Sequence, residues 1–174
     1  MFGDEILRPQ PNDRIIDIGC GTADILNRLP DLDYVGFDHS QRYIDDARLR
    51  HAGRGHFQRV DAGQFVPSSP DRTVAMAIGV LHHLDDNTAA EVFGLASASL
   101  APGGRFVSID PTIVEGQHPI ARFLASQDRG QNVRTPEQMS DLLQPHFDRV
   151  SVSVRHDLLR VPYSHVVTEA RASG

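Results

Sequence analysis

The chain has 174 residues, 40% hydrophobic and 23% charged, which is the size and composition of one globular domain with a buried core. Its net charge of −6 argues against a broad nucleic-acid-binding face, which would need clustered positive charge. All 17 basic residues are arginine, so lysine Schiff-base chemistry and a P-loop are excluded. The single cysteine, Cys20, excludes an internal disulfide, and with no signal pattern or membrane-length apolar stretch we expect a cytoplasmic protein.

Apolar runs that alternate with helix-like stretches are typical of a doubly wound α/β sheet. The run at 73–78 is continuously apolar, so we expect it in the centre of the sheet. The expected strands are 14–18, 34–37, 55–59, 73–78, 105–109, 150–155 and 165–169. The expected helices are 23–29, 41–51, 88–100 and 136–144, and a tight turn is expected at 102–104. No helix separates the last two strands, so they should form an antiparallel pair.

Three of these helices carry a recognisable start signal. Ser40 is placed to cap the helix at 41–51. Thr88 with Glu91, and Thr135 with Gln138, have the spacing of a capping box, in which each side chain bonds the backbone N–H of the other residue. These signals fix where the three helices should begin.

The most informative segment is the glycine-rich turn after the first strand. The strand ends in a carboxylate, Asp17, and Gly19 and Gly21 follow two residues apart. Glycine adopts the backbone conformations that such a turn needs, and its missing Cβ lets a ligand lie on the main chain. A helix starting directly afterwards would point its free N–H groups at the same place. The turn therefore predicts a nucleotide-type ligand at the first strand of a parallel sheet.

Residues that follow the other strands are also candidates, because ligands of doubly wound sheets bind along the carboxyl ends of the strands. Asp38, Asp61, Gly79 and Asp110 follow the second, third, fourth and fifth strands. Asp38 comes about twenty residues after the glycine turn, the usual place of a carboxylate that binds a ribose. A charge-assisted hydrogen bond of this kind contributes about 1.5–3 kcal/mol.

Five segments now form a pattern that extends over nearly the whole chain, from about residue 14 to 170. They read IDIGCGT, VGFDHS, VDA, VLHHL and LAPGG, at 16–22, 35–40, 60–62, 80–84 and 100–104. In this order and at this spacing, the chain resembles the class I S-adenosylmethionine-dependent methyltransferases. The resemblance implies a Rossmann-like, mostly parallel sheet of seven strands with helices on both faces. It also implies that the last strand is antiparallel and inserted beside the fifth.

The resemblance further implies a site for S-adenosylmethionine, which would leave as S-adenosylhomocysteine. Asp38 would bind the ribose hydroxyls, and Asp61 would bind the adenine amino group. Gly79 would lie near the methionine carboxylate or the sulfonium. The residues implied in cofactor binding are Asp17, Gly19, Gly21, Asp38, His39, Asp61, Ala62 and Gly79.

Two other readings of the glycine turn remain. A dinucleotide dehydrogenase would have a third glycine at position 24, where this chain has Asp24, a carboxylate that would repel a pyrophosphate. The short-chain dehydrogenases also need a catalytic lysine, which the chain lacks. The other reading is a catalytically silent methyltransferase-like domain that binds the cofactor or a partner.

The acceptor side is expected in the segment 112–134, which should cover the strand ends within a single domain of residues 1–174. Residues proposed to face a small-molecule acceptor are His83, Asp110, Arg122, Arg129 and Arg134. Arginine pairs well with carboxylates and phosphates.

His82 and His83 are weak candidates for a catalytic base, because histidine titrates near neutral pH. In-line methyl transfer depends mainly on positioning, so no catalytic base is required. No cluster of residues has metal-ligand spacing, so no metal is expected. Little sequence precedes the first expected strand, so we expect a site that is open, closed by 112–134, or completed by a second subunit in a homodimer.

Overall fold

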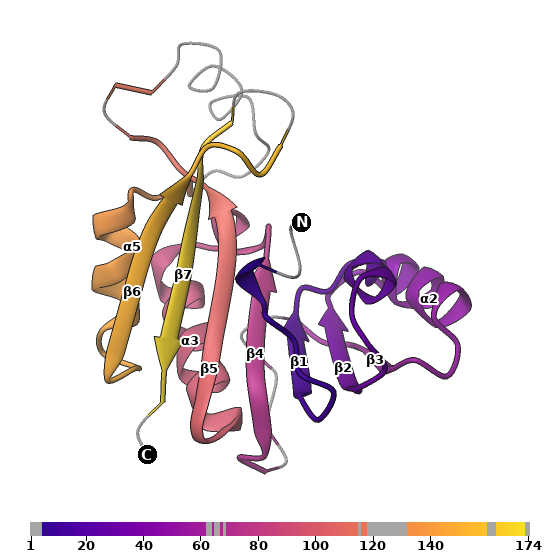
Figure 1. The fold of residues 1–174 in the computed structure, drawn as a ribbon. Coiled ribbons are helices and arrows are strands. Elements are labelled where there is room, and N and C mark those ends of the chain that lie inside the picture. Colours follow the sequence, from indigo (N-terminus) through magenta and orange to yellow (C-terminus); the bar gives the residue numbers. More distant parts are fainter. Residues whose placement is uncertain are drawn as a thin grey trace.

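Seven strands form one sheet in the order β3-β2-β1-β4-β5-β7-β6, which runs from right to left in Figure 1. The computed structural model describes residues 5–61, 64, 67, 69–114, 116–117, 132–159 and 163–172. The strands are β1 Arg14–Ile18, β2 Asp33–Asp38, β3 His56–Arg59, β4 Arg72–Ile78, β5 Leu100–Pro111, β6 Arg149–Arg155 and β7 His165–Arg171. β1 to β5 pair in parallel, and β7 is antiparallel to both β5 and β6. The predicted topology, with the last strand inserted beside the fifth, is confirmed.

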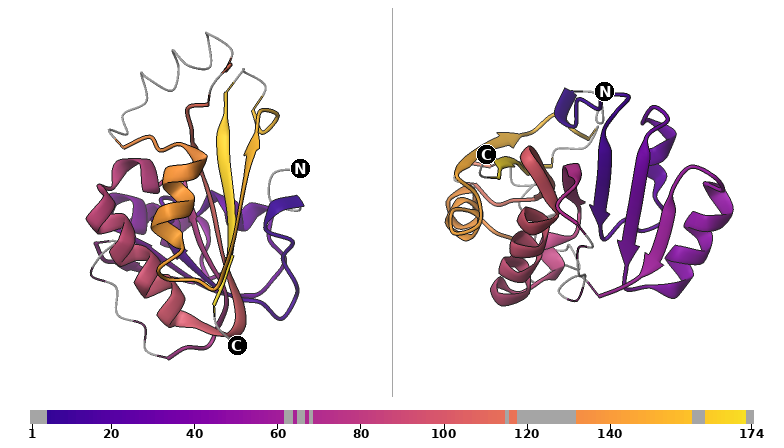
Figure 2. Two further views of the ribbon diagram at one scale, coloured as in Figure 1. Left: turned by 90° about the vertical axis from the view of Figure 1, so that its left-hand side faces the viewer. Right: turned by 90° about the horizontal axis from the view of Figure 1, so that it is seen from below.

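Helices cover both faces of the sheet, as predicted. α3 (Asp86–Ser99) and α5 (Pro136–Leu143) lie together on one face, and α2 (Gln41–Arg50) lies on the other (Figure 2). Two buried apolar clusters follow this division. One contains Phe93 of α3 and Met139 of α5, and the other contains Ile44 of α2. Burial on both faces explains the apolar run in the middle of β4, because Val74–Ala77 are buried whichever face they point to.

The helix predicted directly after the glycine turn is much shorter than expected. Only one turn of 3-10 helix, η1 (Asp24–Asn27), follows the turn. Ala23 has a φ of 55°, in the left-handed region, and this conformation cannot be part of a right-handed helix. The prediction of a helix at 23–29 was therefore wrong, and a single turn offers no extended row of free N–H groups to a ligand.

Helix starts were predicted with mixed success. The capping box of α5 is confirmed: Thr135 Oγ1 accepts a hydrogen bond from the Gln138 N–H, and the Gln138 side chain accepts one from the Thr135 N–H. The box predicted at Thr88 is wrong. The Asp85 carboxylate accepts the Thr88 N–H at 2.8 Å, so α3 begins at Asp86, two residues earlier than expected. An aspartate is at least as good an N-cap as a threonine, and it comes first in the chain.

The turn predicted before the fifth strand lies inside β5. β5 pairs with β4 at Leu100 and again from Arg105 onwards, with a register shift between the two pairs. Residues 101–104 therefore form an irregularity in a longer strand, not a connection before it.

Candidate cofactor-binding site

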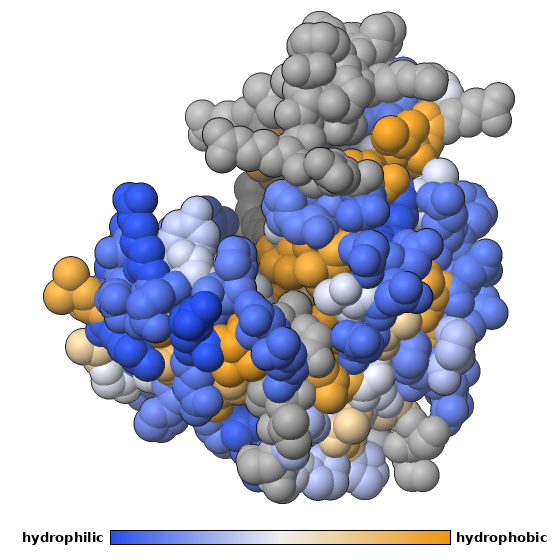
Figure 3. Space-filling view, turned by 180° about the vertical axis from the view of Figure 1, so that it is seen from behind, coloured by the Kyte–Doolittle hydropathy of each residue, from blue (hydrophilic) through white to orange (hydrophobic). Residues whose placement is uncertain are grey.

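A cavity of about 1410 Å³ lies at the carboxyl ends of β1, β2 and β4. Figure 3 shows a hollow on this side of the molecule, with apolar side chains (orange) at its centre and hydrophilic ones (blue) around it. The predicted cofactor residues that line the cavity are Asp17, Gly19, Gly21, Asp38, His39, Asp61 and Gly79. Ala62 lies outside the described residues. The topology therefore brings together residues that are as far apart in sequence as Asp17 and Gly79.

The glycine turn is held by the end of the neighbouring strand. The N–H groups of Gly19 and Cys20 both donate to the Phe37 carbonyl, at 2.7 and 2.8 Å. Gly19 and Gly21 have φ values of 74° and 55°, which favour glycine. A Cβ on Gly19 would overlap the Val80 side chain, whereas a Cβ on Gly21 would meet no atom within 4 Å. The turn thus packs against the loop after β4 at Gly19 and leaves bare backbone open at Gly21.

Asp38 is fixed in place by backbone groups from two sides. Its Oδ2 accepts the Gly21 N–H at 3.0 Å, and its Oδ1 accepts the Ser40 N–H at 2.8 Å. The residue is only 7% exposed, yet it lines the cavity. Each carboxylate oxygen has a further lone pair. A pair of neighbouring hydroxyls, such as those of a ribose, can therefore donate to a carboxylate that is already oriented.

Asp17 is the most deeply buried carboxylate of the cavity wall. Burial raises its pKa from 3.8 to about 7, against the lowering effect of a hydrogen bond from the Tyr34 hydroxyl, and the charge of Asp38 adds to the rise. The Tyr34 Oη lies 2.5 Å from Asp17 Oδ2. A cation beside Asp17 would favour its ionised form. The site is thus suited to a ligand that brings a positive charge, such as an α-ammonium group.

We expect Asp17→Asn to raise the stability of the ligand-free protein at alkaline pH. The pKa of Asp17 is higher in the folded than in the unfolded protein. Its contribution to the stability of the folded protein is therefore full below about pH 4 and is lost as the pH rises through about 7. Asparagine carries no charge to bury, so the melting temperature should rise by about 3 °C or more at pH 8, measured by thermal unfolding. The exposed Asp31→Asn is the control, and an unchanged pH profile in Asp17→Asn would contradict the expectation.

The two histidines after β4 have different environments. His82 of η3 (Leu81–His83) is buried, and its Nδ1 lies 2.9 Å from Asp110 Oδ1. Its ring lies 4.0 Å, centroid to centroid, from that of His83, which lines the cavity. Of the two candidate bases, only His83 lines the cavity. Asp110 is 1% exposed and bonded to His82, which corrects the expectation that it faces an acceptor.

Arg134 is also buried within the fold, contrary to its expected place on the acceptor side. Its guanidinium donates to the carbonyls of Leu81 and Leu84, both at 2.7 Å, and to Asp86 at 2.9 Å. Thr112 Oγ1 donates to the Arg134 carbonyl at 2.8 Å, and the two residues form a parallel bridge. Arg134 therefore ties the loop after β4 to the end of β5. Arg122 and Arg129 lie outside the described residues.

Several cavity residues were not predicted from the sequence. Leu158 and Leu159 reach the cavity from the connection between β6 and β7, and Arg28 reaches it from the end of η1. The sequence pattern places Tyr34 in a strand and gives it no further role. Its hydroxyl contact with Asp17 follows from the parallel register of β1 and β2, which the sequence does not state.

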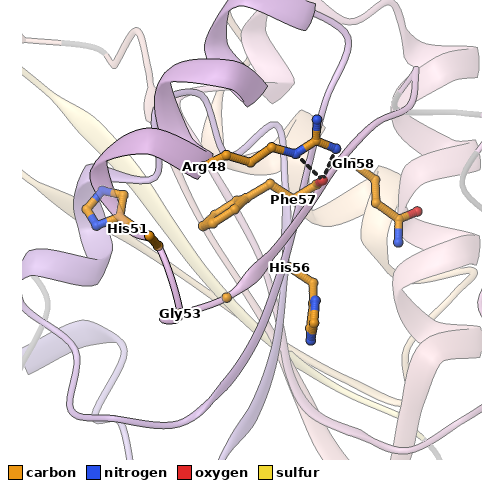
Figure 4. A pocket seen from close by; sticks show the side chains of 8 residues that line it. Arg48, His51, Gly53, His56, Phe57 and Gln58 are labelled. Carbon is orange, nitrogen blue, oxygen red and sulfur yellow. Dashed lines mark hydrogen bonds between the residues drawn. The ribbon is translucent and has the colours of Figure 1, made fainter.

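A smaller cavity of about 380 Å³ lies beside the end of α2 and the start of β3. Figure 4 shows its labelled polar side chains pointing in different directions, with the Arg48 guanidinium bonded to the Phe57 carbonyl. Nothing there converges on a common point. Among the described residues, no cluster of histidine, cysteine, aspartate or glutamate could hold a metal ion. None of their helices has the length and apolar character to span a membrane.

A doubly wound sheet with a glycine turn and a following carboxylate at its open edge defines a domain that binds nucleoside-type ligands. Residues 16–106, about half of the chain, match the family model described as a methyltransferase domain. The chain therefore belongs to the S-adenosylmethionine-dependent methyltransferases of class I, and S-adenosylmethionine is its cofactor.

Relatives and solved structures agree with this assignment. The chain is 29% identical over 180 residues to the trans-aconitate 2-methyltransferase of Acidovorax sp. (strain JS42), a match that covers 96% of this chain and 67% of that protein. A methyltransferase from Methanosarcina mazei has the same fold, with a TM-score of 0.73 at 15% identity over 94% of each chain. An N-methyltransferase of Haemonchus contortus, solved with S-adenosylhomocysteine, gives 0.76 at 14% identity over 99% of this chain and 52% of its own. The chain thus spans about two thirds of the first of these relatives.

Proposed function

We propose that this domain transfers the methyl group of S-adenosylmethionine directly to a nucleophile on a small-molecule acceptor. The observation that carries the proposal is the oriented carboxylate of Asp38, bonded to the N–H groups of Gly21 and Ser40 at the edge of the large cavity. A carboxylate fixed in this way before any ligand arrives suits the paired hydroxyls of a ribose.

The other cofactor contacts are proposed from position and charge. Asp61 lines the cavity beside β3 and would accept from the adenine amino group, with Ala62 beside the ring. Asp17 would bind the α-ammonium group, which its burial favours. The bare backbone of Gly21 and Gly79 gives the ligand room, because a Cβ at either position would meet nothing within 4 Å. His39 and Gly19 complete the proposed binding residues.

The sulfonium supplies an activated methyl group when the cofactor is bound. The lone pair of the acceptor forms the new bond to carbon, and the electrons of the broken carbon–sulfur bond stay on sulfur. The residues of this chain then have to orient the acceptor in line and exclude water. His83 lines the cavity and is the residue proposed to accept a proton when the nucleophile carries one.

A small carboxylic acid is the first acceptor class to test. The Acidovorax relative is named as an enzyme that methylates trans-aconitate, a carboxylic acid. Arg28 lines the cavity, and within the described part of the chain its guanidinium has no acidic partner. An arginine of this kind can bind a carboxylate through two parallel hydrogen bonds.

The test is a measurement of S-adenosylhomocysteine release with panels of carboxylic acids, phenols and amines, trans-aconitate included. We expect turnover with at least one acid, lost in Asp38→Ala and reduced about tenfold or more in Arg28→Ala. Cofactor binding without release in any panel would favour the catalytically silent alternative. Binding of a nicotinamide dinucleotide in its place would contradict the proposal outright.

We also propose a location and an oligomeric state. The single cysteine suits a reducing compartment, so we propose a cytoplasmic location. A second subunit could complete the cavity, and light scattering at micromolar concentration would test for a homodimer.

A further inference from the structure

The Tyr34 hydroxyl contacts Asp17, a residue of the proposed cofactor site, so a role for Tyr34 rests on the proposed function. Tyr34 lies two residues before Gly36 on β2. Gly36 is paired with Asp17 of β1 in the parallel register. Side chains two residues apart on a strand point to the same face. The Tyr34 ring therefore runs along the sheet, past Gly36, and its hydroxyl reaches the carboxylate on the adjacent strand.

A dedicated slot holds this ring. A Cβ on Gly36 would lie 3.1 Å from Tyr34 Cε1, and one on Gly55 would lie 2.9 Å from Tyr34 Cδ1. The Phe57 ring lies 5.9 Å away, centroid to centroid, at 54°. Tyr34 is 1% exposed. Two glycines thus leave the space that the ring fills, and the ring has no freedom to move its hydroxyl away from Asp17.

The hydroxyl engages only one of the two Asp17 oxygens. Tyr34 donates to Oδ2 at 2.5 Å, and Oδ1 has no hydrogen-bond partner among the described residues, although Asp17 lines the cavity. Donation to the carboxylate favours its ionised form. The other titratable groups that face Asp17 are Asp38 on β2 and Cys20 in the turn, and the β4 neighbour is the uncharged Met76.

We propose that Tyr34 is a positioning residue for the cofactor: it holds Asp17 Oδ2 so that Oδ1 presents a negative charge to the α-ammonium group. Without the hydroxyl, the Asp17 carboxylate loses the donor that holds Oδ2, and it gains a proton more readily. The pKa of Asp17 is raised to about 7, so a small further rise removes much of its charge at neutral pH. A tyrosine buried below the glycine turn thereby sets the pH range over which the amino-acid part of the cofactor is bound.

The test is calorimetric titration of wild type and Tyr34→Phe with S-adenosylhomocysteine. The phenylalanine fills the same slot, so folding should be retained. A rise of about one unit in the pKa of Asp17 should weaken binding about 5- to 10-fold between pH 6 and 7 and less than about 2-fold at pH 8.5. The affinity ratio between the two proteins cancels the titration of the ligand itself.

Three controls separate this role from a structural one. 5′-Methylthioadenosine lacks the amino-acid part, so both proteins should bind it equally. Tyr43→Phe, a tyrosine of the same cavity, should leave the pH dependence unchanged. In an Asp17→Asn background, Tyr34→Phe should cause no further loss, because the two changes remove one interaction.

The possible results test the role of Tyr34 separately from cofactor binding by the domain. A ratio that does not change with pH, or an equal loss for 5′-methylthioadenosine, would overturn the role of Tyr34 alone. If wild type binds neither ligand, the proposed function falls, and the role of Tyr34 falls with it.

Discussion

Replacing Asp38 with alanine is expected to weaken S-adenosylhomocysteine binding by about 10- to 100-fold. The carboxylate accepts the Gly21 N–H at 3.0 Å and the Ser40 N–H at 2.8 Å, so the variant loses two effects together. The ribose hydroxyls lose their acceptors, and the glycine turn loses the bond that ties Gly21 to β2. Titration calorimetry gives the affinity, and thermal unfolding of the ligand-free protein reports the second effect.

Two companion variants sharpen the Asp38 experiment. Asp31→Ala removes an exposed carboxylate outside the cavity and should leave the affinity within about 2-fold. Asp38→Asn keeps the shape and one acceptor, so it should retain more stability than alanine while still losing affinity for the ribose. Unchanged binding in Asp38→Ala would remove the observation on which the proposed function rests.

Replacing Arg134 with methionine is expected to lower the free energy of unfolding by about 3 kcal/mol. The Arg134 side chain is 4% exposed, and its guanidinium donates to the Leu81 and Leu84 carbonyls, both at 2.7 Å. Methionine fills the space of the side-chain stem but leaves both carbonyls without that donor. Denaturant unfolding measures the loss, and an unchanged slope with denaturant would show that the folded state is otherwise intact.

The exposed partner of Arg134 provides the matched control. The side chain of Asp86 is 76% exposed, so Asp86→Ala should cost less than about 1 kcal/mol. The two variants distinguish a structural arginine from one that binds an acceptor. Normal stability with a raised KM in Arg134→Met would restore the acceptor-side role that the sequence suggested.

Much of the fold was predictable because the pattern of apolar residues in the sequence indicates which strands are buried. β1 matches its expected range, and the continuously apolar β4 lies where a strand buried on both faces must lie. The lining of the cavity by Asp17, Gly19 and Asp38 follows from the same logic, since carboxyl ends of parallel strands meet at one edge.

The failures arise where partners far apart in sequence decide the outcome. Asp110 follows an expected strand as Asp38 does, yet it bonds His82 inside the fold, and of the two only Asp38 lines the cavity. Arg134 sits in the expected acceptor segment, but the carbonyls after β4 bury it. The sequence around an arginine does not show whether its side chain is exposed to solvent or donates to the carbonyls of a distant loop. The left-handed conformation of Ala23, the first residue of the predicted helix, has no side-chain signal at all.

The bridge between Thr112 and Arg134 has a consequence for the entropy of the connection between them. The chain leaves β5 at Thr112 and returns at Arg134, and both points are fixed by bonds among themselves and to the loop after β4. Doubling the length of chain between fixed ends costs only about 0.6 kcal/mol of closure entropy. The closure entropy of the connection between these two anchors therefore changes little with its length. The positions of the two anchors, and with them the loop after β4, are thus set by their own hydrogen bonds.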